Sequence, residues 1–261
     1  MPRKSGLGAS APCGREQFGS RQEIMAIPVD AGVDRRTETD RVFFVGMAIA
    51  IAVLVIVGFT TSFLRTDLAS QVRSIWVQAH AAAFTGWVLL FLTQTILVAS
   101  GRRDIHRRLG VAGAALACVM IGLALISAIG GFWKSPPRPA IDHVMLYIVV
   151  HVDMFMFATF VIAGLLLRNR YETHKRLMFL ATVSLLDAVT ERLPGIAHIS
   201  PQAHYLVVDL FVVAGVAYDL MSLRRVNPAY LWGALVIFIA PPASRLIFIF
   251  TVPHLVGVAP G

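Results

Sequence analysis

Residues 42–64 decide the fold, because no charged side chain interrupts the sequence VFFVGMAIAIAVLVIVGFTTSFL. An α-helix of about 20 apolar residues is long enough to cross the roughly 30 Å hydrocarbon core of a bilayer. A soluble core helix rarely needs an apolar run of this length. The stretch therefore predicts a transmembrane helix.

Six further apolar segments follow, over residues 75–99, 109–133, 143–167, 177–193, 204–223 and 230–252. None has the alternation that is typical of a membrane β-barrel strand. Hydrophobic residues make up 57% of the chain and charged residues 15%, against about 45–50% and about 25% in soluble domains. We therefore expect an all-α integral membrane bundle of seven transmembrane helices. The same figures exclude a disordered chain, a collagen-like fibre and a disulfide scaffold.

The polar N-terminal stretch predicts the domain boundaries. Residues 1–40 contain no apolar core, which excludes a secretory signal peptide and predicts a disordered cytoplasmic tail. Met25 is a candidate for the genuine first residue, because residues 1–24 resemble a leader sequence that has been translated together with the protein. Residues 41–253 are then a seven-helix membrane domain, and residues 254–261 a short extracytoplasmic tail.

The formal net charge is +8, and most Lys and Arg side chains lie in the tail up to Arg41 and in three connections, residues 100–108, 168–176 and 224–229. The positive-inside rule places these parts in the cytoplasm and the C-terminus outside, in a bacterial inner membrane. This orientation requires the short segment 177–193 to cross the bilayer. We expect the basic loops to contact anionic lipid, and we expect no nucleic-acid partner.

A weak internal repeat predicts how the helices are arranged. His80 lies in one apolar segment and His106 in the loop after it, and His151 and His174 repeat this order. A third pair of segments is joined by the loop that contains Asn227. We therefore expect one helix followed by three similar helical hairpins.

Ionisable side chains inside the spans are costly, at about 2.5–3.5 kcal/mol each at the centre of a helix on insertion scales, so each needs a partner or a function. The predicted orientation gathers most of these polar groups in the outer half of the bundle: His80, His143, His151, Asp153, Asp187, Glu191, Asp209 and Arg245. Arg245 keeps its charge in proteins, so we expect it to pair with Asp187, Glu191 or Asp209. Pro241 and Pro242 are expected to kink the helix ahead of it.

Four functions are compatible with this polar site. In the first, haem b is ligated by His80 and His151, with His143, Trp87 and Tyr147 around the cofactor. In the second, the chain is a metal-dependent membrane hydrolase whose divalent metal is held by His80, His151, Asp187, Glu191 and Asp209, although the sequence has no HExxH pair.

The third function is a proton-coupled transporter or relay that uses Asp187, Glu191, Asp209 and Arg245. The fourth is a structural or interaction protein without chemistry, in which the buried polar groups hold the helices together. Haem b or metal binding is the function we expect from the sequence, with the structural role and the transporter as the alternatives. The residues leave open whether the chain is an enzyme.

Three motifs carry a resemblance: HAAAFTGW at residues 80–87, HRRLG at residues 106–110 and HKRLM at residues 174–178. Over residues 42–252 the chain resembles an uncharacterised family of bacterial polytopic membrane proteins. It is more distantly similar to small membrane proteins implicated in haem-copper oxidase maturation, which implies a role in redox chemistry or oxidase assembly. Asn227-Pro228 departs from the His-Pro expected there, so the resemblance implies that a histidine ligand or cap is lost.

Overall fold

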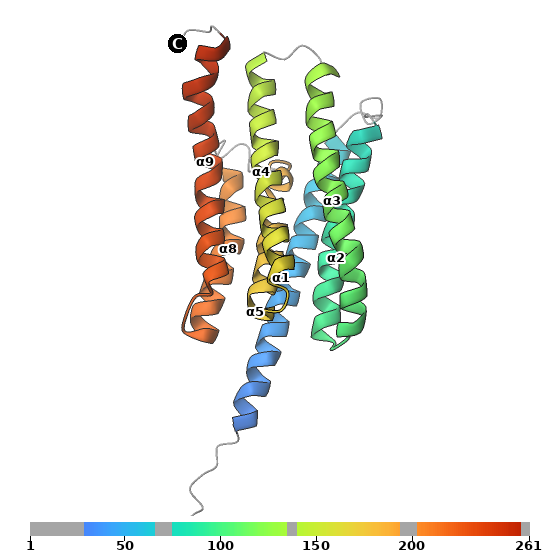
Figure 1. Cartoon of the computed structure of the whole chain (residues 1–261), viewed down its shortest axis with the longest axis vertical. Coiled ribbons are helices and arrows are strands. Elements are labelled where there is room, and N and C mark those ends of the chain that lie inside the picture. The colour runs from blue at the N-terminus through green and yellow to red at the C-terminus, as the bar shows by residue number, and fades with distance from the viewer. Residues whose placement is uncertain (1–28, 66–74, 135–139, 194–202, 257–261) are drawn as a thin grey trace, which may run out of the picture. The chain divides into compact units, whose positions relative to one another are not determined.

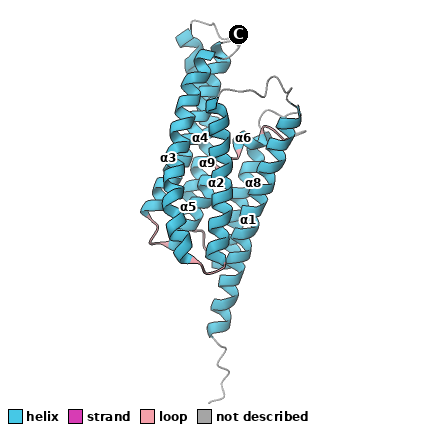
Figure 2. Ribbon diagram, turned by 90° about the vertical axis from the view of Figure 1, so that its right-hand side faces the viewer, coloured by secondary structure: helices cyan, strands magenta, loops and turns pink. Residues whose placement is uncertain are grey.

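The computed structural model describes residues 29–65, 75–134, 140–193 and 203–256, and this part of the chain is helical without any strand (Figures 1 and 2). The chain divides into two compact units, residues 1–38 and residues 39–261. Of the first unit the structure describes residues 29–38, which are helical. The features described below belong to the second unit.

The predicted all-α class is confirmed. The helices are α1 (Val29–Arg65), α2 (Ile75–Ala99), α3 (Arg103–Lys134), α4 (Ala140–Leu166), α5 (Tyr171–Val183), α6 (Asp187–Thr190), α8 (Ala203–Leu223) and α9 (Pro228–Val256). Sequence neighbours α2 and α3, α4 and α5, and α8 and α9 pack against each other, as the hairpin prediction requires. Helix α9 also packs against α4 and α5.

Five helices of the described part are long and apolar enough to cross a membrane, over Thr37–Thr61, Gln78–Ala99, Arg103–Ile126, Tyr205–Leu223 and Pro228–Phe250. A shorter apolar helix covers His151–Leu166. The chain is therefore a multi-pass helical membrane protein.

The distribution of side chains agrees with a lipid environment. Large apolar residues lie on the outside, and Leu64, Leu166 and Met221 are 76%, 77% and 79% exposed. Arg176 and Asp219 are instead completely buried. A soluble protein rarely exposes so much apolar surface while it encloses charged side chains.

The expectation of one continuous crossing helix over residues 177–193 is wrong. Helix α5 begins at Tyr171 and ends at Val183, and after a break at residues 184–186 the short helix α6 covers Asp187–Thr190. At the break the N–H groups of Leu185 and Leu186 donate to the carbonyl oxygens three residues earlier, and close packing borders it: a Cβ atom on Gly58 of α1 would lie 2.7 Å from Val189 Cγ1 and 3.0 Å from the Val189 carbonyl oxygen. The glycine lets the backbone of α6 approach α1 this closely.

Two predicted boundaries also need correction. Helix α1 begins at Val29, so residues 29–40, which were expected in a disordered tail, are helical. Asp40 is held by contacts with Lys175 and Tyr218, which a single sequence does not reveal. At the other end α9 continues to Val256, past the predicted end of the membrane domain at residue 253.

Candidate functional site

Three buried or partly buried carboxyl groups meet inside the bundle. Asp153 of α4, Asp187 of α6 and Asp209 of α8, named here the carboxyl cluster, line one cavity of about 10 Å³. The described residues that line it are Asp153, Met156, Ser184, Asp187, Tyr205, Val208, Asp209, Ile237 and Pro241. None of these described lining residues is Lys, Arg or His.

Local structure explains why these groups share the cavity. The break after α5 brings Ser184 and Asp187 to the same cavity, and Asp187 is only 5% exposed. Asp153 lies close enough to Asp187 and Glu191 for their charges to act on it. On α9, Pro241 has no N–H to donate to the carbonyl of Ile237, four residues earlier, and both residues line the cavity. Oxygen atoms thus dominate the polar surface of the site.

The sequence placed Asp187 and Asp209 in one site, and the structure brings them together at this cavity. Glu191 is exposed and does not line the cavity, although it lies near Asp153. Among the described residues, no group of three or more His, Cys, Asp or Glu side chains is arranged to hold a metal ion.

The two histidines expected to ligate haem lie elsewhere. His80 of α2 is partly buried, its Nδ1 has no hydrogen-bond partner in the described part of the chain, and the charge of Arg192 acts on it. His151 of α4 is also partly buried. Trp87 Nε1 donates a hydrogen bond to Thr182 Oγ1 (3.2 Å), so this tryptophan connects α2 with α5.

Three predicted site residues cannot be placed. The side chains of His143, Tyr147 and Arg245 lie outside the described part of the structure. The expected pairing of Arg245 with a carboxylate of the site therefore stays a prediction.

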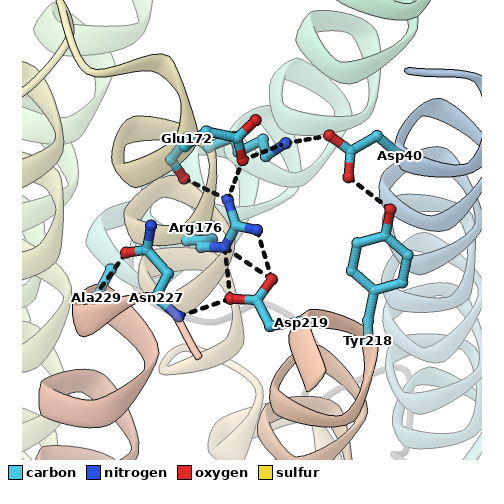
Figure 3. A network of polar contacts seen from close by, with 8 residues as sticks. Asp40, Glu172, Arg176, Tyr218, Asp219, Asn227 and Ala229 are labelled. Carbon is cyan, nitrogen blue, oxygen red and sulfur yellow. Dashed lines mark hydrogen bonds and ion pairs between the residues drawn. The ribbon is translucent and has the colours of Figure 1, made fainter. Parts of the chain in front are cut away.

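A second polar site lies at the end of the bundle where the α2–α3, α4–α5 and α8–α9 turns meet, called here the network end. His106 at the start of α3 and His174 at the start of α5 have ring centroids 6.3 Å apart. At the same end, Arg176 Nε donates to both carboxylate oxygens of Asp219, each at 3.0 Å, and its Nη2 also contacts Asp219 (Figure 3). Both side chains are 0% exposed.

Further contacts extend this ion pair into a network between four helices (Figure 3). Arg176 Nη1 donates to the carbonyl oxygen of Glu172 (2.7 Å) and contacts its carboxylate. Lys175 bridges the carboxylates of Glu172 (2.8 Å) and Asp40. The Tyr218 hydroxyl donates to Asp40 Oδ1 at 2.5 Å. We call these residues together with Asp219 and Asn227 the Arg176 network.

Asn227 performs the capping role that the resemblance assigned to a histidine. Its Oδ1 accepts a hydrogen bond from the Ala229 N–H (3.0 Å), which caps the start of α9, and Pro228 occupies the first helical position. Its own N–H donates to Asp219 Oδ2 (2.9 Å). The departure from His-Pro thus leaves the helix start capped and joined to the Arg176 network.

Sequence reasoning missed most of this network. In the sequence, Lys175 and Arg176 counted as part of the orientation signal and of the HKRLM motif, and Asp40 fell within the predicted tail. One signal was present: Glu172 and Arg176 are four residues apart, and Asp219 lies near the same end of its span. A buried charge needs a partner, so Asp219 could have been matched to the basic loops.

The Glu172 carboxyl gives the network a pH dependence. Partial burial raises its pKa, but hydrogen bonds from Lys175 and Arg176 outweigh this effect and lower the pKa below its ordinary value of 4.5. A lowered folded-state pKa contributes stability that is fully present above the unfolded-state value and is lost as the pH falls through the folded-state value.

We therefore expect the melting temperature of the purified protein to fall when the pH is lowered from about 6 to about 3.5. Glu172→Gln should lower the melting temperature near neutral pH and make the acid-induced decrease smaller. An acid-induced decrease of the same size in the variant and in the wild type would show that Glu172 does not contribute to it.

Comparisons of the chain with protein-family models, with curated proteins and with solved structures found no match. The functional argument below therefore rests on the geometry of the two polar sites.

Proposed function

We propose that the chain is a membrane proton relay, in which the carboxyl cluster binds and releases protons in the course of their passage through the bundle. The observation that carries this proposal is the meeting of Asp153, Asp187 and Asp209 around one small cavity, whose lining among the described residues includes no basic side chain. The three residues come from α4, α6 and α8, so the cluster joins helices that are far apart in the sequence.

The chemistry of the cluster favours a proton. Carboxylates that lie close together in an apolar setting repel each other, and they relieve the repulsion by holding protons. Ionised groups inside a bilayer are also costly and typically mark ion or proton pathways. A structural role would be served by hydrogen-bonding groups that carry no charge.

The size of the cavity supports the same choice. Its volume of about 10 Å³ is close to what one water molecule needs. Pockets for organic ligands measure about 300–1,000 Å³. A proton carried by water fits the cavity, whereas an organic substrate would require a large rearrangement.

The helix break is a further argument. Interrupted helices that expose backbone groups to a polar cavity are common at the binding sites of membrane transporters. Here the break at residues 184–186 and the proline at position 241 border the same cavity.

The orientation of the relay is part of the proposal. Exposed arginines that have no acidic partner among the described residues lie in or beside the three turns of the network end: Arg102, Arg103, Arg107, Arg108, Arg168, Arg170, Arg224 and Arg225. The positive-inside rule and attraction to anionic lipid place this end at the cytoplasmic face of a bacterial inner membrane. The carboxyl cluster then lies nearer the outside, since Asp209 precedes Asp219 by about 15 Å along α8.

Proton flux into sealed vesicles tests the proposal. Purified protein is reconstituted into phospholipid vesicles that contain a pH-sensitive dye, and a potassium diffusion potential drives proton entry. We expect flux well above that of protein-free vesicles, and loss of this flux when Asp153, Asp187 and Asp209 are all replaced by Asn. Asp104→Asn, an exposed carboxylate at the start of α3, is the matched control. Wild-type flux equal to that of protein-free vesicles would contradict the proposal.

A second candidate, haem b binding, is favoured by one observation. Helices α2 and α4 touch where the rings of Trp87 and Phe157 pack edge to face, with centroids 4.9 Å apart. His80 and His151 each precede this contact by about two helical turns, so the two imidazoles lie at similar levels. Bound haem would supply one-electron chemistry. An absorbance band in the reduced-minus-oxidised spectrum that His80→Ala or His151→Ala abolishes would support this candidate, and a colourless preparation would contradict it.

A further inference from the structure

The hydroxyl of Tyr230 is buried without a hydrogen-bond partner. Tyr230 is 0% exposed, and its oxygen is among the buried polar atoms of the described residues that make no hydrogen bond. Burial of an unsatisfied hydroxyl costs free energy, which phenylalanine at this position would avoid. The hydroxyl therefore has a cost that packing alone does not explain.

Helix α8 leaves space for this hydroxyl. A Cβ atom on Gly215 would lie 2.6 Å from the Tyr230 oxygen, so any larger residue at that position would collide with it. The hydroxyl thus lies against the backbone of α8 at Gly215, one turn from Asp219. Gly215 thus provides the room that the Tyr230 hydroxyl needs, which is a second indication that the hydroxyl has a role other than packing.

The position lies between the two polar sites. On α8, Gly215 stands between Asp209 of the carboxyl cluster and Asp219 of the Arg176 network. On α9, Tyr230 shares a helical face with Ile237 and Pro241, which line the cavity. The hydroxyl therefore lies in the space between α5, α8 and α9, at a level between the carboxyl cluster and the Arg176 network.

The ring of Tyr230 already contacts the network. The Arg176 guanidinium carbon lies 5.7 Å from the ring centroid, and Phe179 packs edge to face with it at 6.2 Å. The charged and titratable groups that act on Tyr230 are Arg176 of α5, Asp219 and Tyr218 of α8, and Asp40 of α1.

We propose that the Tyr230 hydroxyl passes protons between the carboxyl cluster and the level of the Arg176 network, with water molecules as the other carriers. This inference rests on the proposed function. In each transfer the oxygen accepts a proton from a protonated water on one side and gives its own proton to a neutral water on the other, so the excess proton moves across and the tyrosine is chemically unchanged.

Apolar side chains occupy the level between the cavity and the hydroxyl. Leu180 of α5 lies between Arg176 and Ser184 in the sequence, and Val212 of α8 lies between Asp209 and Gly215. Both are 0% exposed, and a Cβ atom on Gly233 would lie 2.3 Å from Leu180 Cδ1. The proposed transfer requires water to pass this level.

Tyr230→Phe tests this step, because it removes only the partnerless oxygen. In the vesicle assay we expect proton flux to fall about 100-fold, while the melting temperature stays equal to that of the wild type or rises. A solvent deuterium isotope effect should be present in the wild-type flux and absent from the residual flux of the variant. Tyr171→Phe, at an exposed position, is the matched control.

The outcomes separate this inference from the function on which it rests. Wild-type flux in Tyr230→Phe, with flux still lost in the Asp153, Asp187 and Asp209 triple variant, would overturn the role of Tyr230 alone. Loss of flux together with a lower melting temperature would also overturn it, since the hydroxyl would then be structural. Absence of flux in the wild type would overturn the proposed function itself.

Discussion

Arg176→Ala is expected to destabilise the folded protein by about 3–5 kcal/mol, the cost of removing one partner from a buried ion pair. Arg176 and Asp219 are both 0% exposed, so the Asp219 carboxylate would be left charged and without its partner inside the bundle. The guanidinium also contacts Glu172, so its loss opens the network at two points. The measurement is the unfolding free energy of the purified protein in mild detergent.

Three further variants separate charge from packing. Arg176→Lys should recover little of the loss, because one ammonium group cannot reproduce the guanidinium contacts to Asp219 and Glu172. The double variant Arg176→Met with Asp219→Leu should be more stable than Arg176→Ala, since no lone buried charge remains. Arg102→Ala, at an exposed arginine, should change the unfolding free energy by less than about 0.5 kcal/mol. An Arg176→Ala protein as stable as the wild type would show that the ion pair does not stabilise the fold.

Asp187→Asn is expected to lower proton flux by about 100-fold or more, whereas Glu191→Gln should leave most of it. The two carboxylates are four residues apart and looked equivalent in the sequence. In the structure Asp187 is 5% exposed and lines the cavity, while Glu191 is exposed and outside the lining. Asn keeps the shape and polarity of Asp187 but cannot take up and release a proton.

Flux in the vesicle assay measures this contrast, with the melting temperature as a control for folding. Equal flux in Asp187→Asn and in the wild type would place the pathway away from the cavity. A loss of flux in Glu191→Gln as large as that in Asp187→Asn would show that proximity to the cavity does not decide the role of a carboxylate.

The fold was largely predictable, since bilayer thickness imposes long apolar runs such as residues 42–64. The break between α5 and α6 was not. Residues 177–193 contain no glycine, and Pro194 follows the segment, so local sequence offers no helix breaker at residues 184–186. The interruption coincides with contacts from other helices, such as Gly58 against Val189, and these pair residues far apart in the chain.

The candidate site was predictable in part. The helical positions of Asp187 and Asp209 and their shared depth were sufficient to place them together. That Asp187 lines the cavity and Glu191 does not depends on the helix break. The ion-pair partners of Arg176 and Asp40 depend on which helices lie next to each other. A single sequence shows the cost of a buried charge but does not identify the group that compensates it.

Infrared difference spectroscopy of the reconstituted protein tests the carboxyl cluster most directly. A change of pH should alter the carbonyl-stretch band of protonated carboxyl groups in the wild type, and this signal should disappear when Asp153, Asp187 and Asp209 are replaced by Asn. The Asp104→Asn control should keep the full band. A band that is absent from the wild type, or unchanged in the triple variant, would contradict proton binding at the cluster.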